Sequence, residues 1–263
     1  MSARGAGRRL REWIPAVVVF VAAVGLWEGL TVALDVQQFL LPRPTSIVSS
    51  FWTDRHSLWP AGWYTFKEAL GGFALGSVLG VLVASAVARF RRVGSALLPL
   101  AVAANAVPVI AFAPIFNAWF NPLSPHSKMA IAGVLCFTPV LVNTLRGLQS
   151  ASPRQIELMR SYAASDFEIW RRVRVPTALP YVFTALKVAS VLAMIGAVVG
   201  EYFGGALTAL GVIIRSDAQI FQFDTAWAAI LVASLLGLTL YGSVAAAERA
   251  VVRWSPELRS ADR

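Results

Sequence analysis

The chain has 263 residues, of which 57% are hydrophobic and only 14% are charged. This composition excludes most water-soluble globular proteins, because such chains carry about 25% charged residues. The formal net charge of +9 would suggest nucleic-acid binding in a soluble chain, but here the basic residues lie between apolar segments. The sequence therefore predicts an all-α, polytopic membrane protein that binds no nucleic acid.

About six transmembrane helices are expected, since long uncharged apolar segments can each cross about 30 Å of hydrocarbon. The first follows several arginines but is longer than the apolar part of a signal peptide, so we interpret it as an uncleaved helix. The third contains several prolines and should be broken or kinked. In chain order, the expected spans cover residues 14–34, 65–88, 97–120, 128–145, 179–199 and 226–247.

Arginine and lysine set the expected orientation, because short basic loops are retained in the cytoplasm. With the N-terminus inside, most of the 23 basic residues fall in cytoplasmic segments. We therefore expect both termini to be cytoplasmic. Residues 1–13 and 248–263 would be cytoplasmic tails that flank a transmembrane domain over residues 14–247.

The only long connection expected in the cytoplasm, residues 146–178, is predicted to contain two short helices. Residues 152–155 (Ser-Pro-Arg-Gln) combine an N-cap serine, a proline at the first helical position and a capping-box partner. Residues 165–168 (Ser-Asp-Phe-Glu) repeat the capping box, so a second helix should begin there. Pro176 and Pro180 are expected to end it.

The second short helix would present an apolar edge next to three arginines between residues 171 and 174. Phe167, Trp170 and Val173 recur at every third position and form this edge. Two interpretations are open from these residues alone. The edge docks on a partner protein, or it packs on the protein's own helix ends or at the lipid interface, where tryptophan is common.

This segment resembles the EAA loop of ABC importer permeases, whose pattern is Glu-Ala-Ala, a glycine, and Ile-x-Leu-Pro after nine further residues. Here Leu158 and Met159 replace the two alanines, and Ala163 replaces the glycine, so the turn must form without glycine's conformational freedom. In that family the loop is the coupling helix that docks on the ATP-binding subunit, which favours the docking interpretation. The resemblance implies that the contact residues are Glu157, Ala163, Ser165, Asp166, Phe167, Trp170, Val173, Val175 and Pro176.

Several separated segments resemble, in the same order, the nitrate/sulfonate/taurine branch of binding-protein-dependent permeases. They are residues 41–48, 69–76, 108–114, 199–202 and 210–211. Residues 200–205 and 241–254 look closer to permeases for thiamine-pyrimidine or riboflavin precursors. The resemblance implies the type I ABC importer permease fold in a bacterial cell membrane.

The same resemblance implies ATP-driven import of a small organic or anionic solute by alternating access. The solute would be a sulfonate, nitrate, or a vitamin precursor of the pyrimidine or riboflavin type. The implied partners are a second permease copy, two ATP-binding subunits, an extracytoplasmic solute-binding protein and membrane lipid. ATP and Mg would be bound by the ATP-binding subunits, and no cofactor by this chain.

Strongly polar groups at membrane depth are candidates for the translocation pathway, because they are costly there unless paired or wetted. Glu201 either faces the pathway or accepts backbone amides in the turn 200–205. Lys187 is expected to be structural, with its ammonium group directed to the cytoplasm. The pathway candidates, including a proline that interrupts the third span, are Asn105, Pro108, Asn143, Glu201 and Tyr202.

Gly72, Gly76 and Gly80 form a stripe of small residues, which we expect to serve packing within the chain rather than a dimer seam. The sequence has no P-loop motif, catalytic residues or metal-spaced cluster, so we expect a transport subunit and not an enzyme. The alternative function is a stand-alone, ion-coupled secondary transporter with Glu201 or Lys187 as the coupling group. No internal repeat typical of such folds is evident. A scaffolding membrane protein is a second alternative.

Overall fold

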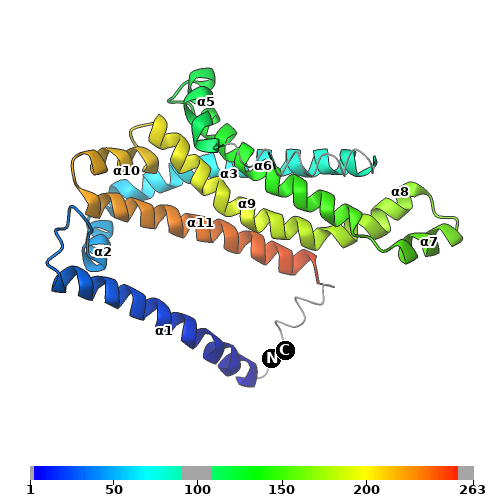
Figure 1. Ribbon diagram of the computed structural model, residues 1–263, viewed down its shortest axis with the longest axis horizontal. Coiled ribbons are helices and arrows are strands. Elements are labelled where there is room, and N and C mark those ends of the chain that lie inside the picture. Colours follow the sequence, from blue (N-terminus) through cyan, green and yellow to red (C-terminus); the bar gives the residue numbers. More distant parts are fainter. Residues whose placement is uncertain (1–2, 91–102, 104–107, 254–263) are drawn as a thin grey trace.

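The computed structural model describes residues 3–90, 103 and 108–253, and this part of the chain is helical without any strand (Figure 1). Asn105 therefore lies outside the described residues. A 3₁₀ turn, η1 (Val109–Phe112), and a π-helical turn, η2 (Trp170–Arg174), accompany the α-helices. The α-helices are α1 (Ala3–Ala33), α2 (Pro44–Thr53), α3 (Arg55–Ala88), α5 (Ala113–Phe120), α6 (Pro125–Gln149), α7 (Pro153–Ser161), α8 (Asp166–Ile169), α9 (Val175–Phe203), α10 (Leu210–Gln219) and α11 (Phe223–Val251).

Within the described residues, five helical segments are long and apolar enough to cross a membrane. They correspond to α1, α3, α6, α9 with the preceding α8 and η2, and α11. The first predicted span agrees with the apolar segment Ile14–Ala33. The helices α3, α6, α9 and α11 extend beyond their predicted spans, and α3 begins at Arg55 and not at residue 65. The predicted span 97–120 falls partly outside the described residues, and its described remainder is η1 followed by the short helix α5.

Three long helices, α3, α6 and α9, pack along one another, and α11 covers α9 (Figure 1). Small side chains make this close packing possible, because they let helix backbones approach. On α9, the residues at every fourth position that face this core are fully buried alanines. They are Ala185, Ala189, Ala193 and Ala197.

The glycine stripe of α3 lies against α6 of the same chain, so the prediction of intrachain packing is confirmed. A Cβ added to Gly76 would fall against the carbonyl oxygen of Gly133 and 2.9 Å from the Cβ of Cys136. A Cβ on Gly80 would lie 3.0 Å from the carbonyl oxygen of Phe137. Glycine is required here because the backbones themselves are in contact.

The first helix, α1, lies at the edge of the molecule and is connected to the bundle through α2 (Figure 1). Trp27 packs edge-on against Trp227 of α11, with ring centroids 5.4 Å apart. The Glu28 carboxylate accepts hydrogen bonds from the backbone amide of Thr45, at 3.1 Å, and from its hydroxyl, at 2.8 Å. The Glu28 hydrogen bonds fix the turn between α1 and α2, and the tryptophan pair adds a direct contact between α1 and α11.

The expectation that Pro176 and Pro180 end the second short helix is wrong, because α8, η2 and α9 form one continuous helical segment. Proline lacks a donor and collides with the carbonyl group one turn earlier. The π-helical turn directly before Pro176 provides the extra room, since the Val175 amide bonds back to the Trp170 carbonyl oxygen. The hydroxyl of Thr184 donates to the carbonyl oxygen of Pro180, at 2.9 Å.

The two ends of the bundle differ. At one end, α5 and α10 connect the long helices, and we call this the α10 end (Figure 1). At the other end, α7 and α8 project beyond α6 and α9, and we call this the α7 end (Figure 1). The predicted coupling residues lie in and next to the projecting helices, and the described pathway candidates lie on α6, on α9 and directly before η1.

Candidate functional site

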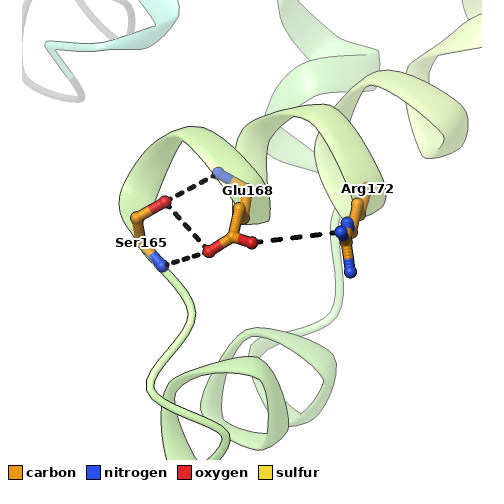
Figure 2. Close-up of polar contacts among 3 residues, drawn as sticks. All are labelled: Ser165, Glu168 and Arg172. Carbon is orange, nitrogen blue, oxygen red and sulfur yellow. Dashed lines mark hydrogen bonds and ion pairs between the residues drawn. The ribbon is translucent and has the colours of Figure 1, made fainter.

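The projecting segment contains the predicted capping box at the start of α8 (Figure 2). The Ser165 hydroxyl accepts a hydrogen bond from the Glu168 amide at 3.3 Å, and the Ser165 amide donates to the Glu168 carboxylate at 2.9 Å. Arg172 lies 3.9 Å from the other carboxylate oxygen of Glu168. The first predicted capping box is wrong in one respect: Ser152 is the N-cap of α7, but its side chain makes no capping hydrogen bond.

The turn between α7 and α8 is built on Ala163, which has a φ of 57°. The Ala164 amide donates to the Met159 carbonyl oxygen at 3.0 Å, which closes the helix in the manner of a Schellman motif. This is the position at which the family pattern has glycine, and the backbone keeps the left-handed conformation although the residue is alanine. An L-residue in this conformation costs about 1–2 kcal/mol.

Replacing Ala163 with glycine is therefore expected to stabilise the turn by about 0.5–1 kcal/mol, after the greater flexibility of glycine in the unfolded chain is included. Hydrogen exchange of the α7 amides should become slower in Ala163→Gly. Ala164→Gly is the matched control, because the φ of Ala164 is not positive, and this variant should exchange faster. Equal behaviour of the two variants would contradict the assignment of strain to Ala163.

Phe167 and Trp170 form the exposed aromatic edge of the projecting segment. Their rings stack with centroids 6.1 Å apart and an angle of 21°. Phe167 is 65% exposed and Trp170 36% exposed, whereas Ile169 is buried. Val173 is half-buried and Glu157 is exposed on α7. Most of the Phe167 side chain and about a third of the Trp170 side chain are accessible to another molecule, while the rest of Trp170 is covered by the chain itself.

A basic cavity of about 840 Å³ lies between this segment and the end of α3. Guanidinium groups reach it from α7, from η2 and from the residue after α3. Such a surface favours acidic side chains of a partner, because arginine binds carboxylates through paired hydrogen bonds. Its lining includes Ser85, Arg89, Arg160, Asp166, Trp170 and Arg174.

The pathway candidates are not brought together at one site. The Asn143 amide donates to the Pro139 carbonyl oxygen of its own helix, at 2.9 Å, and Pro108 is exposed before η1. The Tyr202 side chain is exposed, and its carbonyl oxygen accepts from Arg215 at 3.0 Å. Glu201 is fully buried and accepts a hydrogen bond from the Gly211 amide at 2.8 Å. One of the two interpretations of Glu201 was that it accepts backbone amides of the turn 200–205, but the amide that it accepts belongs to Gly211 of α10.

Glu201 lies beside two ionisable residues that the sequence analysis did not include among the candidates, Glu68 of α3 and Lys128 of α6. Both are buried, and Lys128 stands at the first position of the predicted span 128–145. A sequence signal existed for Glu68, since it precedes Gly72 and Gly76 by one and two helical turns and must share their buried face. The polar cluster was missed because its members lie on separate helices.

Lys187 forms an ion pair with Glu248 of α11, with 2.7 Å between its ammonium nitrogen and the carboxylate. Its expected structural role is supported, but the ammonium group is directed to a neighbouring helix. Both side chains are mostly buried, so each needs the other as a counter-charge. The pair joins α9 to the end of α11.

An open apolar cavity of about 520 Å³ lies between α9, α10 and α11. None of the described pathway candidates lines it. In the described part of the chain, no group of three or more His, Cys, Asp or Glu residues is arranged to hold a metal ion. The cavity is lined by Val191, Met194, Ile195, Val198, Val199, Ile214, Ile230, Ala233, Ser234, Gly237 and Leu238.

Comparison with known proteins gives consistent matches along the chain. A family described as "Binding-protein-dependent transport system inner membrane component" matches residues 76–253. The riboflavin transport system permease protein of Chloroflexus aurantiacus is 32% identical, over 92% of this chain and 91% of that protein. The formylaminopyrimidine transport permease protein of Halalkalibacterium halodurans is 34% identical, over 94% of this chain and 98% of that protein.

A more distant relative is the putative aliphatic sulfonates transport permease protein of Escherichia coli, which is 26% identical over 94% of this chain and 95% of that protein. Among solved structures, the crystal structure of an amino acid ABC transporter is similar in fold, with a TM-score of 0.61 and 15% sequence identity. The similarity covers 77% of this chain and 97% of that one.

Proposed function

The chain belongs to the family of binding-protein-dependent transport system inner membrane components, and on this premise we propose that it carries a small solute into the cytoplasm by alternating access. It is a multi-pass inner-membrane permease subunit of an ABC importer. Such importers work with an ATP-binding subunit and a solute-binding protein. Two identical copies of this chain would form the pathway, with two ATP-binding subunits on the cytoplasmic side.

The observation that carries this function is the stacked, exposed pair Phe167 and Trp170 on a helix fixed by its own capping box. An exposed aromatic pair on a rigid support is a typical anchor of a protein interface. The ATP-binding subunit would contact it together with Glu157. The helix from α8 to α9 is continuous, so movement of the docked subunit would be transmitted directly to the core of the bundle.

This assignment places the α7 end in the cytoplasm, together with both termini, and the α10 end outside. The distribution of basic residues supports the same orientation, because the α7 end carries most of the arginines. The loop 146–178 would be the coupling loop of a transmembrane domain over residues 14–247. The solute-binding protein would dock at the α10 end.

For the solute, we favour a vitamin precursor of the pyrimidine or riboflavin type over a sulfonate or nitrate. The relatives named for riboflavin and formylaminopyrimidine transport are 32% and 34% identical, whereas the sulfonate relative is 26% identical. The apolar cavity beside α9 also suits a flat heteroaromatic ring better than a small inorganic anion, because desolvating an anion there would be costly.

The test is affinity purification of the tagged chain from its native membrane, followed by mass spectrometry and reconstitution in proteoliposomes. A copurifying P-loop ATPase and uptake that requires ATP are expected. Riboflavin and formylaminopyrimidine should compete for uptake, and taurine and nitrate should not. A chain that purifies alone and transports with an ion gradient would favour the stand-alone secondary transporter instead.

A further inference from the structure

Three ionisable side chains meet inside the bundle, where the protein itself excludes solvent. Glu68 of α3 and Lys128 of α6 are each 1% exposed, and Glu201 of α9 is 0% exposed. The Glu68 carboxyl group lies next to the Glu201 carboxyl group and the Tyr64 hydroxyl, and the Lys128 ammonium group is near enough to act on it through its charge. We call Glu68, Lys128 and Glu201 the buried triad.

The triad joins the helices at the α10 end. The Lys128 side chain packs against Gly200, and its ammonium group donates to the carbonyl oxygens of Pro122 and Ser124. One oxygen of Glu201 accepts from the Gly211 amide at the start of α10. The helix α10 thus provides the triad with one backbone N–H donor, the Gly211 amide. The charged Arg215 of the same helix donates instead to the Tyr202 carbonyl oxygen.

No hydrogen bond of normal length and geometry reaches three carboxyl oxygens of the triad from the described residues, the Tyr64 hydroxyl included. They are both oxygens of Glu68 and the Oε1 atom of Glu201. Buried polar atoms in native proteins are nearly always hydrogen-bonded, so unpaired oxygens on two adjacent acids need an explanation. Two ionised carboxylates cannot bond to each other, because neither has a hydrogen to donate.

The net charge of the triad also requires an explanation. Two ionised carboxylates and one ammonium group would leave one uncompensated negative charge in an enclosed site, which is strongly unfavourable. Two acids that share such a site do not both ionise. A bridging water molecule would satisfy the oxygens but would not remove the charge.

We propose that Glu68 and Glu201 share one proton, so that the buried triad is a proton-binding site and is electrically neutral. The shared O–H group supplies the missing donor between the two acids, and Lys128 balances the remaining negative charge. The proton belongs to the pair and not to one residue. An arrangement of the helices that lets water reach the triad would release this proton, so binding it favours the packed arrangement.

Infrared spectroscopy of the full-length chain in lipid nanodiscs at neutral pH tests the proposal directly. The wild type should show the carbonyl band of a protonated carboxylic acid. Both Glu68→Gln and Glu201→Gln should lose this band, because the one remaining carboxylate is then balanced by Lys128. Glu157→Gln, which removes an exposed carboxylate on α7, is the control and should keep it. Absence of the band from the wild type, or its persistence in either triad variant, would overturn the proposal.

Thermal unfolding gives a second readout that does not depend on spectral assignment. Each single glutamine variant keeps the triad neutral and should unfold within a few degrees of the wild type. The double variant leaves Lys128 as an uncompensated buried charge and should unfold roughly 5–10 °C lower. If one single variant lowers the midpoint as much as the double variant does, the two acids do not share one proton.

Discussion

Replacing Trp170 with aspartate is expected to abolish ATP-driven uptake while the chain still folds and inserts into the membrane. Trp170 stacks on Phe167 at the edge of the proposed coupling loop, and neither ring is part of the hydrophobic core. Loss of an aromatic anchor costs at least about 2 kcal/mol of binding free energy, which is about 30-fold in affinity. A charge placed in the desolvated interface adds to this loss.

Two measurements check this result: recovery of the ATP-binding subunit on the tagged permease, and ATP-dependent uptake in proteoliposomes. Glu157→Lys, on the exposed face of α7, should also uncouple the two subunits. Phe221→Asp is a suitable control, because Phe221 is as exposed as Phe167 but follows α10 at the opposite end. It should leave recovery of the ATP-binding subunit unchanged. Unaltered recovery and uptake with Trp170→Asp would exclude the proposed docking surface.

Replacing Gly76 with alanine is expected to destabilise the bundle by about 2 kcal/mol, and a valine there should prevent stable folding. The added Cβ meets the Gly133 carbonyl oxygen and the Cys136 Cβ of α6. Because the carbonyl oxygen belongs to the backbone, no side-chain rotation relieves the overlap, and α3 and α6 must move apart. The midpoint of thermal unfolding, followed by size-exclusion chromatography, should fall.

The same interface supplies a matched control in Gly133, directly opposite Gly76. A Cβ on Gly133 would lie 3.5 Å from the Gly72 carbonyl oxygen and 3.8 Å from the Gly76 amide, which are ordinary contact distances. Gly133→Ala should therefore be tolerated. Gly242→Ala, on a surface with no atom within 4 Å, should also be neutral. Equal losses of stability in Gly76→Ala and Gly133→Ala would mean that the distance from the added Cβ to its neighbours does not determine whether alanine is tolerated.

In the proposed coupling loop, the features that depend on neighbouring residues could be predicted from the sequence. The capping box of Ser165 and Glu168 and the turn at Ala163 were located correctly, because each depends on neighbours within a few residues. Pro176 was misjudged as a helix end, because the π-helical turn that accommodates it is a property of the continuous backbone. The aromatic edge was predicted from its spacing, but the structure was needed to show how much of each ring is exposed.

The sequence by itself determined the family, the all-α membrane architecture and most spans, because hydrophobicity and the family motifs depend on residues that are close together in the sequence. It also indicated that the glycine stripe serves intrachain packing. Only the tertiary structure decided that Glu68, Lys128 and Glu201 form one buried triad and that Lys187 pairs with Glu248. The physical reason is that these interactions join separate helices, and their partners are fixed by how the helices pack and not by spacing in sequence.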